Sequence, residues 1–238
     1  MKSGYFKRGL FVDLTGGGAE RRGLSDEFLD RYVGGRGFGA KLVWDNLVRH
    51  NFEIDPLGPQ NLVVIAPGPL TGTLLPSSGK CSFVSISPQT GIYGDSSIGG
   101  SLGAEIRQTG VDFVAITGRA SELSVLVIDE DETRVVPMPQ LAGKTCLESE
   151  GKIKEHFGSH EIKVAVIGPG GENLIRFATV NADWSRNAGR TGMGAILGSK
   201  NLKAIVVRGG KDLPVHDTRA LMEEADKAYA YMRNHKYF

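Results

Sequence analysis

An internal repeat constrains the fold of this 238-residue chain more than any other sequence feature. Residues 61–70 (NLVVIAPGPL) and 162–171 (IKVAVIGPGG) each lead an apolar run into a turn containing Gly and Pro. Residues 102–120 and 193–210 each place a short helical stretch that begins near Gly-Ala before an apolar strand and a glycine turn. Because both pairs stand in the same order, they indicate a duplicated unit. We therefore expect an α+β fold in which two similar mixed β-sheets, with flanking helices, are related by a pseudo-twofold axis.

The repeat also sets the expected domain boundaries. One domain spanning residues 1–212 would contain both copies, at 61–120 and 162–210. Asp217 is typical of a helix N-cap, and the apolar spacing after it predicts a long helix. We interpret 213–238 as the start of a helical second domain that is cut short, since no stop signal closes this helix.

Composition narrows the class of protein. Lys and Arg number 28 and Asp and Glu number 27, which gives no reason to expect a nucleic acid or a membrane surface as a partner. The only cysteines, Cys81 and Cys146, form no CxxC, so a zinc ribbon or a self-contained iron–sulfur site is excluded. No apolar stretch approaches the ~18 residues of a membrane-spanning helix. We expect a soluble, cytoplasmic protein.

Glycine, at 33 residues, is strongly enriched, and four glycine-rich loops are candidates for binding phosphate groups. They lie at 34–39, 66–73, 94–103 and 186–194. Glycine allows backbone N–H groups to approach a phosphate closely, and a following helix N-terminus adds its dipole. We expect the third and fourth loops to face each other across the pseudo-twofold axis and to bind a ligand with two phosphate groups. Simple turn formation, with solvated arginines, is the alternative.

No spacing in the sequence indicates a catalytic residue. Ser96 and Ser97 do not match a GxSxG turn, and Gly158 breaks the helix that would align His156 with His160. A Walker A motif is absent, and the GxGxxA-like run at 35–40 follows a predicted helix rather than a strand. Any chemistry would therefore come from a cofactor or from residues outside this chain.

Four motifs stand in a fixed order along the sequence. They are 66–73 (APGPLTGT), 99–105 (GGSLGAE), 167–173 (IGPGGEN) and 188–205 (AGRTGMGAILGSKNLKAI). Together they resemble the N-terminal domain of the tungsten-containing aldehyde:ferredoxin oxidoreductase family. That resemblance implies a duplicated α+β cradle for a bis-pyranopterin (molybdopterin) tungsten cofactor. In this family, downstream domains carry a [4Fe–4S] cluster and the acid–base residues.

The resemblance implies an activity that residues 1–238 alone could not perform. An aldehyde and water would yield a carboxylic acid, with electrons passing through the cluster to ferredoxin. Partners implied are the remainder of the polypeptide or a cluster-bearing subunit, ferredoxin, and a second copy in a homodimer, with neither nucleic acid nor membrane. The sequence leaves open whether the metal is tungsten or molybdenum. It also leaves open whether the substrate is an aldehyde or an aromatic acyl-CoA ester.

The resemblance also assigns residue roles. The residues implied to hold the cofactor are Lys80, Ser97, Gly99, Gly100, Arg186, Asn187, Gly189 and Arg190. Lys80 stands where family members often have Arg, between pterin and cluster. Backbone carbonyls at Ser97 and Asn187 would bind a Mg²⁺ that bridges the pterin phosphates, and Ser97 replaces the Asn expected there.

Two other classes of protein stay open. The departures at Lys80 and Ser97 are compatible with a non-catalytic scaffold or accessory subunit that kept the fold and lost the cofactor. A stand-alone nucleotide-binding module is the third class, although the missing Walker A and strand–GxGxxG contexts weigh against it. Metal and pterin content would separate the first two, and a nucleotide titration would test the third.

Overall fold

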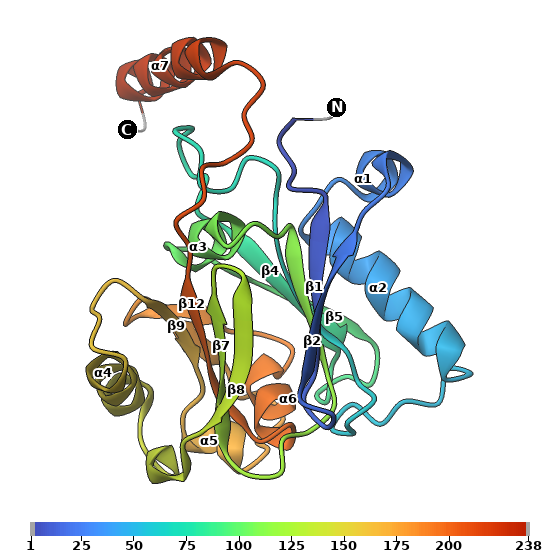
Figure 1. Ribbon diagram of the computed structural model, residues 1–238. Coiled ribbons are helices and arrows are strands. Elements are labelled where there is room, and N and C mark those ends of the chain that lie inside the picture. The colour runs from blue at the N-terminus through green and yellow to red at the C-terminus, as the bar shows by residue number, and fades with distance from the viewer. Residues whose placement is uncertain (1–2, 237–238) are drawn as a thin grey trace.

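The computed structural model, which describes residues 3–236, contains two six-stranded β-sheets (Figure 1). The first has the order β2-β1-β6-β3-β4-β5, with β1 (Arg8–Asp13), β2 (Gly18–Gly23), β3 (Val63–Pro67), β4 (Cys81–Ile86), β5 (Tyr93–Ile98) and β6 (Phe113–Thr117). The second has the order β11-β10-β9-β12-β7-β8, with β7 (Ser124–Asp129), β8 (Glu132–Pro137), β9 (Lys163–Val166), β10 (Val180–Ala182), β11 (Arg186–Ala188) and β12 (Leu202–Arg208). Only β1–β6 and β7–β12 pair in parallel, so both sheets are mixed, as predicted.

Most of the helices lie either on the outer faces of the sheets or in the space between the sheets. They are α1 (Asp26–Tyr32), α2 (Arg36–Arg49), α3 (Leu102–Gln108), the 3₁₀ turn Pro139–Leu141, α4 (Cys146–His156), α5 (Pro169–Glu172), α6 (Met193–Ser199) and α7 (Thr218–Asn234). Side-chain caps begin three of them: Ser25 accepts from Phe28 N, Asp217 from Ala220 N, and Thr145 forms a capping box with Glu148. Helix α7 stands apart from both sheets (Figure 1).

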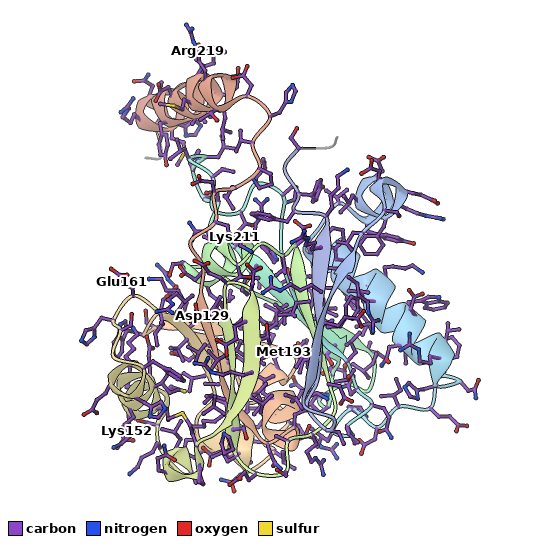
Figure 2. The ribbon with its side chains drawn as sticks, viewed as in Figure 1. Asp129, Lys152, Glu161, Met193, Lys211 and Arg219 are labelled. Atoms are coloured by element: carbon purple, nitrogen blue, oxygen red, sulfur yellow. The ribbon has the colours of Figure 1, made fainter. Side chains whose placement is uncertain are left out.

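Three apolar clusters build the core. Helices α1 and α2 cover the outer face of the first sheet through residues such as Leu29 and Phe38, and α4 covers the outer face of the second through Ile153. The central cluster joins the inner faces of both sheets with α3 and α6, and Met193 lies within it (Figure 2). Burial of these faces supplies the main driving force for folding.

The strand register corrects the predicted alignment of the repeat by one residue. Ala115 and Val206 correspond in the aligned segments 102–120 and 193–210. Val64 pairs with Ala115, and Val164 pairs with Val206, so Val64 corresponds to Val164. Aligning 61–70 with 162–171 had placed Val64 against residue 165. The corrected register sets the Gly-Pro of 68–69 against that of 168–169.

Several predicted loops contain strands instead. Strand β5 overlaps the predicted loop 94–103, β11 lies within 186–194, and β2 follows a turn where no second strand was expected. The sequence also predicts a strand near 173–180, but residues 173–179 form an irregular segment and only Val180 belongs to the short β10. The missed strands lie at or near sheet edges, where polar side chains and glycine replace the apolar runs that reveal central strands.

Lys200 is a buried cation that makes stability depend on pH. Its Nζ donates to the carbonyls of Pro59 and Gly118 at 3.2 Å each. Burial, together with the nearby Arg119, lowers the pKa of Lys200 to about 7. An unfolded lysine has a pKa of roughly 10.4, so the unfolded chain binds more protons above pH 7. Raising the pH through this range therefore favours the folded state.

We predict that the melting temperature rises between about pH 7 and pH 9 more steeply in the wild type than in Lys200→Met, which cannot titrate at this position. Scanning calorimetry of both proteins across the range measures the difference. Identical pH profiles would contradict a neutralised lysine at this site.

Candidate cofactor site

The edge strands β5 and β11 lie side by side where the two sheets meet. The backbone N–H of Arg190 donates to Ser96 Oγ at 3.1 Å. Asp183 accepts from the backbone N–H and from the hydroxyl of Ser101, at 2.6 and 2.9 Å. The two segments that the repeat predicts to face each other are therefore in direct contact.

Ser97 and Asn187 occupy equivalent places on these two edge strands. Ser97 lies opposite Ser82 on β4, and Asn187 lies opposite Asn181 on β10. Since Ser82 and Asn181 pair in turn with equivalent positions on β3 and β9, the register makes Ser97 and Asn187 counterparts. The side-chain amide of Asn187 is engaged within the protein, because it donates to the Ser185 carbonyl at 3.1 Å.

Exposed cations gather around this edge. The side chains of Lys80, Arg186 and Arg190 are exposed, and none of them forms an ion pair with any residue between 3 and 236. Lys80 immediately precedes β4, and Arg186 packs its aliphatic stem against Gly100. Unpaired guanidinium and ammonium groups are the groups that proteins use to hold phosphate oxygens.

Two glycines at the edge keep space open above the backbone. A Cβ at Gly99 would have no atom within 4 Å, and one at Gly189 would meet only Asn187 Cβ at 4.0 Å. Neither residue has the positive φ that requires glycine. Gly100 differs, because its φ is +93° and a Cβ there would collide with Asp183. Gly99 and Gly189 thus each leave open space that a larger side chain would fill.

The Ala-Pro-Gly turn holds the chain at Lys80 in place. Thr71 Oγ1 accepts from the Gly68 N–H at 2.9 Å and donates to the Lys80 carbonyl at 2.8 Å. Sequence reasoning missed Thr71 and Asp183 as supports of the site. Thr71 lies inside the 66–73 motif (APGPLTGT), which could have indicated its role. Nothing in the sequence around Asp183 indicates that it binds a turn 82 residues away.

The remaining candidate groups are the His, Cys, Asp and Glu side chains elsewhere in the described chain. No group of three or more His, Cys, Asp or Glu residues capable of holding a metal occurs in the part of the chain that the structure describes. Burial raises the pKa of the Cys81 thiol to about 12, which leaves it un-ionised and unreactive. None of the described helices is long and apolar enough to cross a membrane.

Together these features define a duplicated α+β domain with a cationic, glycine-lined edge suited to a phosphate-bearing ligand. The profile of the family described as "Aldehyde ferredoxin oxidoreductase, N-terminal domain" matches residues 9–209. The chain therefore belongs to the aldehyde ferredoxin oxidoreductase family, as the sequence motifs predicted.

Relatives and solved structures agree with this assignment. The chain is 39% identical over 220 residues to the tungsten-containing aldehyde ferredoxin oxidoreductase of Pyrococcus abyssi, covering 92% of this chain and 36% of that protein. For the Thermococcus kodakarensis enzyme the values are 37% over 231 residues, 97% and 38%. A solved chain of "Active site complex BamBC of Benzoyl Coenzyme A reductase in complex with 1,5 Dienoyl-CoA" superposes with a TM-score of 0.93 at 32% identity, covering 98% of this chain and 35% of that one. The chain thus spans less than two fifths of the length of these relatives.

Asp183 should be the main support of the contact between the two edge strands. Asp183→Ala removes both hydrogen bonds to Ser101, each of which is charge-assisted and contributes about 1.5–3 kcal/mol. We expect the melting temperature to fall by about 5 °C or more. Asp183→Asn, which keeps one acceptor and tolerates the φ of +47° at this position, should melt closer to the wild type. Wild-type melting of Asp183→Ala would contradict this role.

Proposed function

We propose that this chain is the cofactor-cradling N-terminal domain of a tungstopterin enzyme that oxidises an aldehyde and water to a carboxylic acid. Electrons would leave through a [4Fe–4S] cluster to ferredoxin, both outside this chain. The observation that carries the proposal is the open space at Gly99 and Gly189, beside three cations that form no ion pair within residues 3–236. Curated relatives named as tungsten-containing support the choice of cofactor.

The cations would bind the pterin phosphates. Arg186 and Arg190 can present planar forks of N–H donors to phosphate oxygens, whereas Lys80 offers a single point charge. Gly99, Gly100 and Gly189 would let the ligand approach the main chain. When bound, the cofactor supplies the oxygen-transfer and redox chemistry, and the residues of this domain hold and orient it.

A magnesium ion would be held by the backbone carbonyls of Ser97 and Asn187. Their equivalent positions on two adjoining edge strands support a shared, symmetric role. Magnesium prefers oxygen ligands, and a main-chain ligand does not depend on the side chain that carries it. Ser97 in place of Asn is then compatible with the same contact.

The acid–base and cluster-binding residues would lie in the remainder of the polypeptide or in a cluster-bearing subunit. Among residues 3–236 no group of three or more His, Cys, Asp or Glu residues could hold a metal ion. One relative, from Pyrococcus furiosus, is named "Aliphatic sulfonate oxidoreductase, WOR-like subunit", which supports a multi-subunit arrangement. We propose a cytoplasmic enzyme, with a homodimer as one form of the assembly.

Reduction of an aromatic acyl-CoA ester is the second candidate activity. The close structural match to a chain from a benzoyl-coenzyme A reductase complex favours it. The residues that would choose between these substrates would lie mostly outside this chain. Assays of the full-length protein with aliphatic aldehydes and with benzoyl-CoA separate the two activities.

Arg186→Ala in the full-length protein should lower cofactor retention. Loss of one charge-assisted phosphate contact is expected to weaken binding by at least about tenfold. Tungsten measured by mass spectrometry, together with pterin fluorescence after oxidation, reports the occupancy. Arg219→Ala on the separate helix α7, where Arg219 pairs only with Glu223, is the matched control. Unchanged metal and pterin content would remove Arg186 from the site, and their absence from the wild type would favour the scaffold alternative.

Gly99→Ala tests whether the open space is there for a ligand. Nothing in the domain is displaced by the added methyl group, so we expect the melting temperature of the cofactor-free protein to change by less than about 2 °C. Cofactor occupancy should nevertheless fall. Gly23→Ala on β2, where a Cβ also has no neighbour within 4 Å, should leave both measurements unchanged. Full occupancy in Gly99→Ala would show that the ligand does not use this space.

A further inference from the structure

A cavity of about 560 Å³ opens beside β1 and β2, at the end of the first sheet that lies away from β5. Strands β1 and β2 and the C-terminal half of α2 surround it, and Phe11, Leu42, Leu62 and Ala115 form its apolar floor. None of the residues assigned to the cofactor lines it. The cavity is therefore separate from the candidate cofactor site.

Because the two halves are duplicated, this cavity can be compared with the equivalent place on the second sheet. A smaller cavity, of about 130 Å³, occupies the corresponding place on the second sheet. In strand register, Asp13 pairs with Thr117 at the end of β1–β6, and Asp129 pairs with Arg208 at the end of β7–β12. Asp13 and Asp129 are thus counterparts, and so are Thr117 and Arg208.

In the second sheet the aspartate is neutralised within the protein. Arg208 donates to Asp129 through two bonds, Nε to Oδ1 at 2.9 Å and Nη2 to Oδ2 at 2.5 Å. Figure 2 labels Asp129 in the second sheet, which contains β7. This forked geometry is the strongest arrangement between a guanidinium and a carboxylate. Arg208 and Asp129 both line the smaller cavity.

In the first sheet the aspartate has no such cation. Thr117 replaces the arginine, and Asp13 forms no ion pair within residues 3–236, accepting only from the Thr15 N–H at 3.0 Å. The nearby Lys200 is buried and donates to the carbonyls of Pro59 and Gly118. A carboxylate and a large cavity are left where the other half places its own guanidinium.

The remaining charges on the cavity wall are mostly paired. Arg22 binds Glu20 at 2.7 Å and lies 4.6 Å above the Phe11 ring, and Asp45 is bound by Lys41 at 2.6 Å. These pairs leave Asp13 as the lining carboxylate available to a cation. Arg49, at the end of α2, forms no ion pair in the described chain and is available to an oxygen acceptor.

We propose that this cavity binds an alkylguanidinium group, whose cation takes on Asp13 the place that Arg208 occupies on Asp129. The alkyl part packs on the apolar floor, as arginine stems do on apolar surfaces. The group belongs either to a free small molecule or to an arginine side chain of a peptide. The site is independent of the tungsten cofactor.

Calorimetric titration of the full-length protein with butylguanidine tests the proposal, with neutral butylurea as an isosteric probe. We expect butylguanidine to bind at least about tenfold more tightly than butylurea. A peptide with blocked ends, Gly-Arg-Gly, distinguishes the sources: binding at least as tight as butylguanidine indicates a side-chain ligand, and weaker binding indicates a free small molecule. Equal binding of butylguanidine and butylurea, or no binding of either, would overturn the proposal.

Two substitutions locate the site. Asp13→Asn should weaken butylguanidine at least about tenfold, whereas Asp129→Asn, its counterpart in the second sheet, should leave the affinity unchanged. Thr117→Arg recreates the internal pair of the second half and should abolish binding while preserving the melting temperature. Undiminished binding in a folded Thr117→Arg protein would refute the assignment of this cavity.

Discussion

The fold depends on one constraint: each sheet has two apolar faces, and the helices on its outer side cover only one of them. Helix α2 buries the outer face of the first sheet, and α4 buries that of the second. The inner faces, with α3 and α6, can leave water only by packing against each other. That packing brings the edge strands β5 and β11 together. The candidate cofactor site is therefore a geometric consequence of how the two halves share a core.

Duplication preserves the backbone and leaves the side chains free to diverge. The position shared by Ser97 and Asn187 lies on the exposed edge in both halves. At another shared register position the side chains differ: beside Thr117, Asp13 forms no ion pair within the described residues, whereas Arg208 binds Asp129. Where the halves agree, the shared position would serve the ligand that we propose lies between them. Where they differ, the first half has a large cavity beside Asp13, whereas in the second half Arg208 binds the equivalent Asp129 and the cavity is smaller.

The sequence predicted the parts of this fold that local patterns encode. Apolar strands such as β3 and β12, the helix begun by Asp217, and the duplicated arrangement all follow from periodicity, caps and repeats. The strand β2 was missed because GAERRG carries charge on an exposed edge and has no apolar face to reveal it. The one-residue slip in the repeat arose because both alignments match apolar to apolar, and only the hydrogen-bonded register separates them.

The candidate site exposes a further limit on what sequence patterns can tell. Gly99 and Gly100 are adjacent and look alike in the sequence, yet the structure separates their roles. Gly100 is required by its positive φ and by the carboxylate of Asp183, whereas Gly99 is required by nothing within the domain. A glycine in ordinary backbone conformation with empty space above it gains the protein no stability, because an alanine would restrict the unfolded chain more. The presence of Gly99 at a cationic edge is best explained by a group that the folded domain must accommodate. The difference between Gly99 and Gly100 becomes visible only once the contact between Asp183 and the turn 82 residues earlier is known.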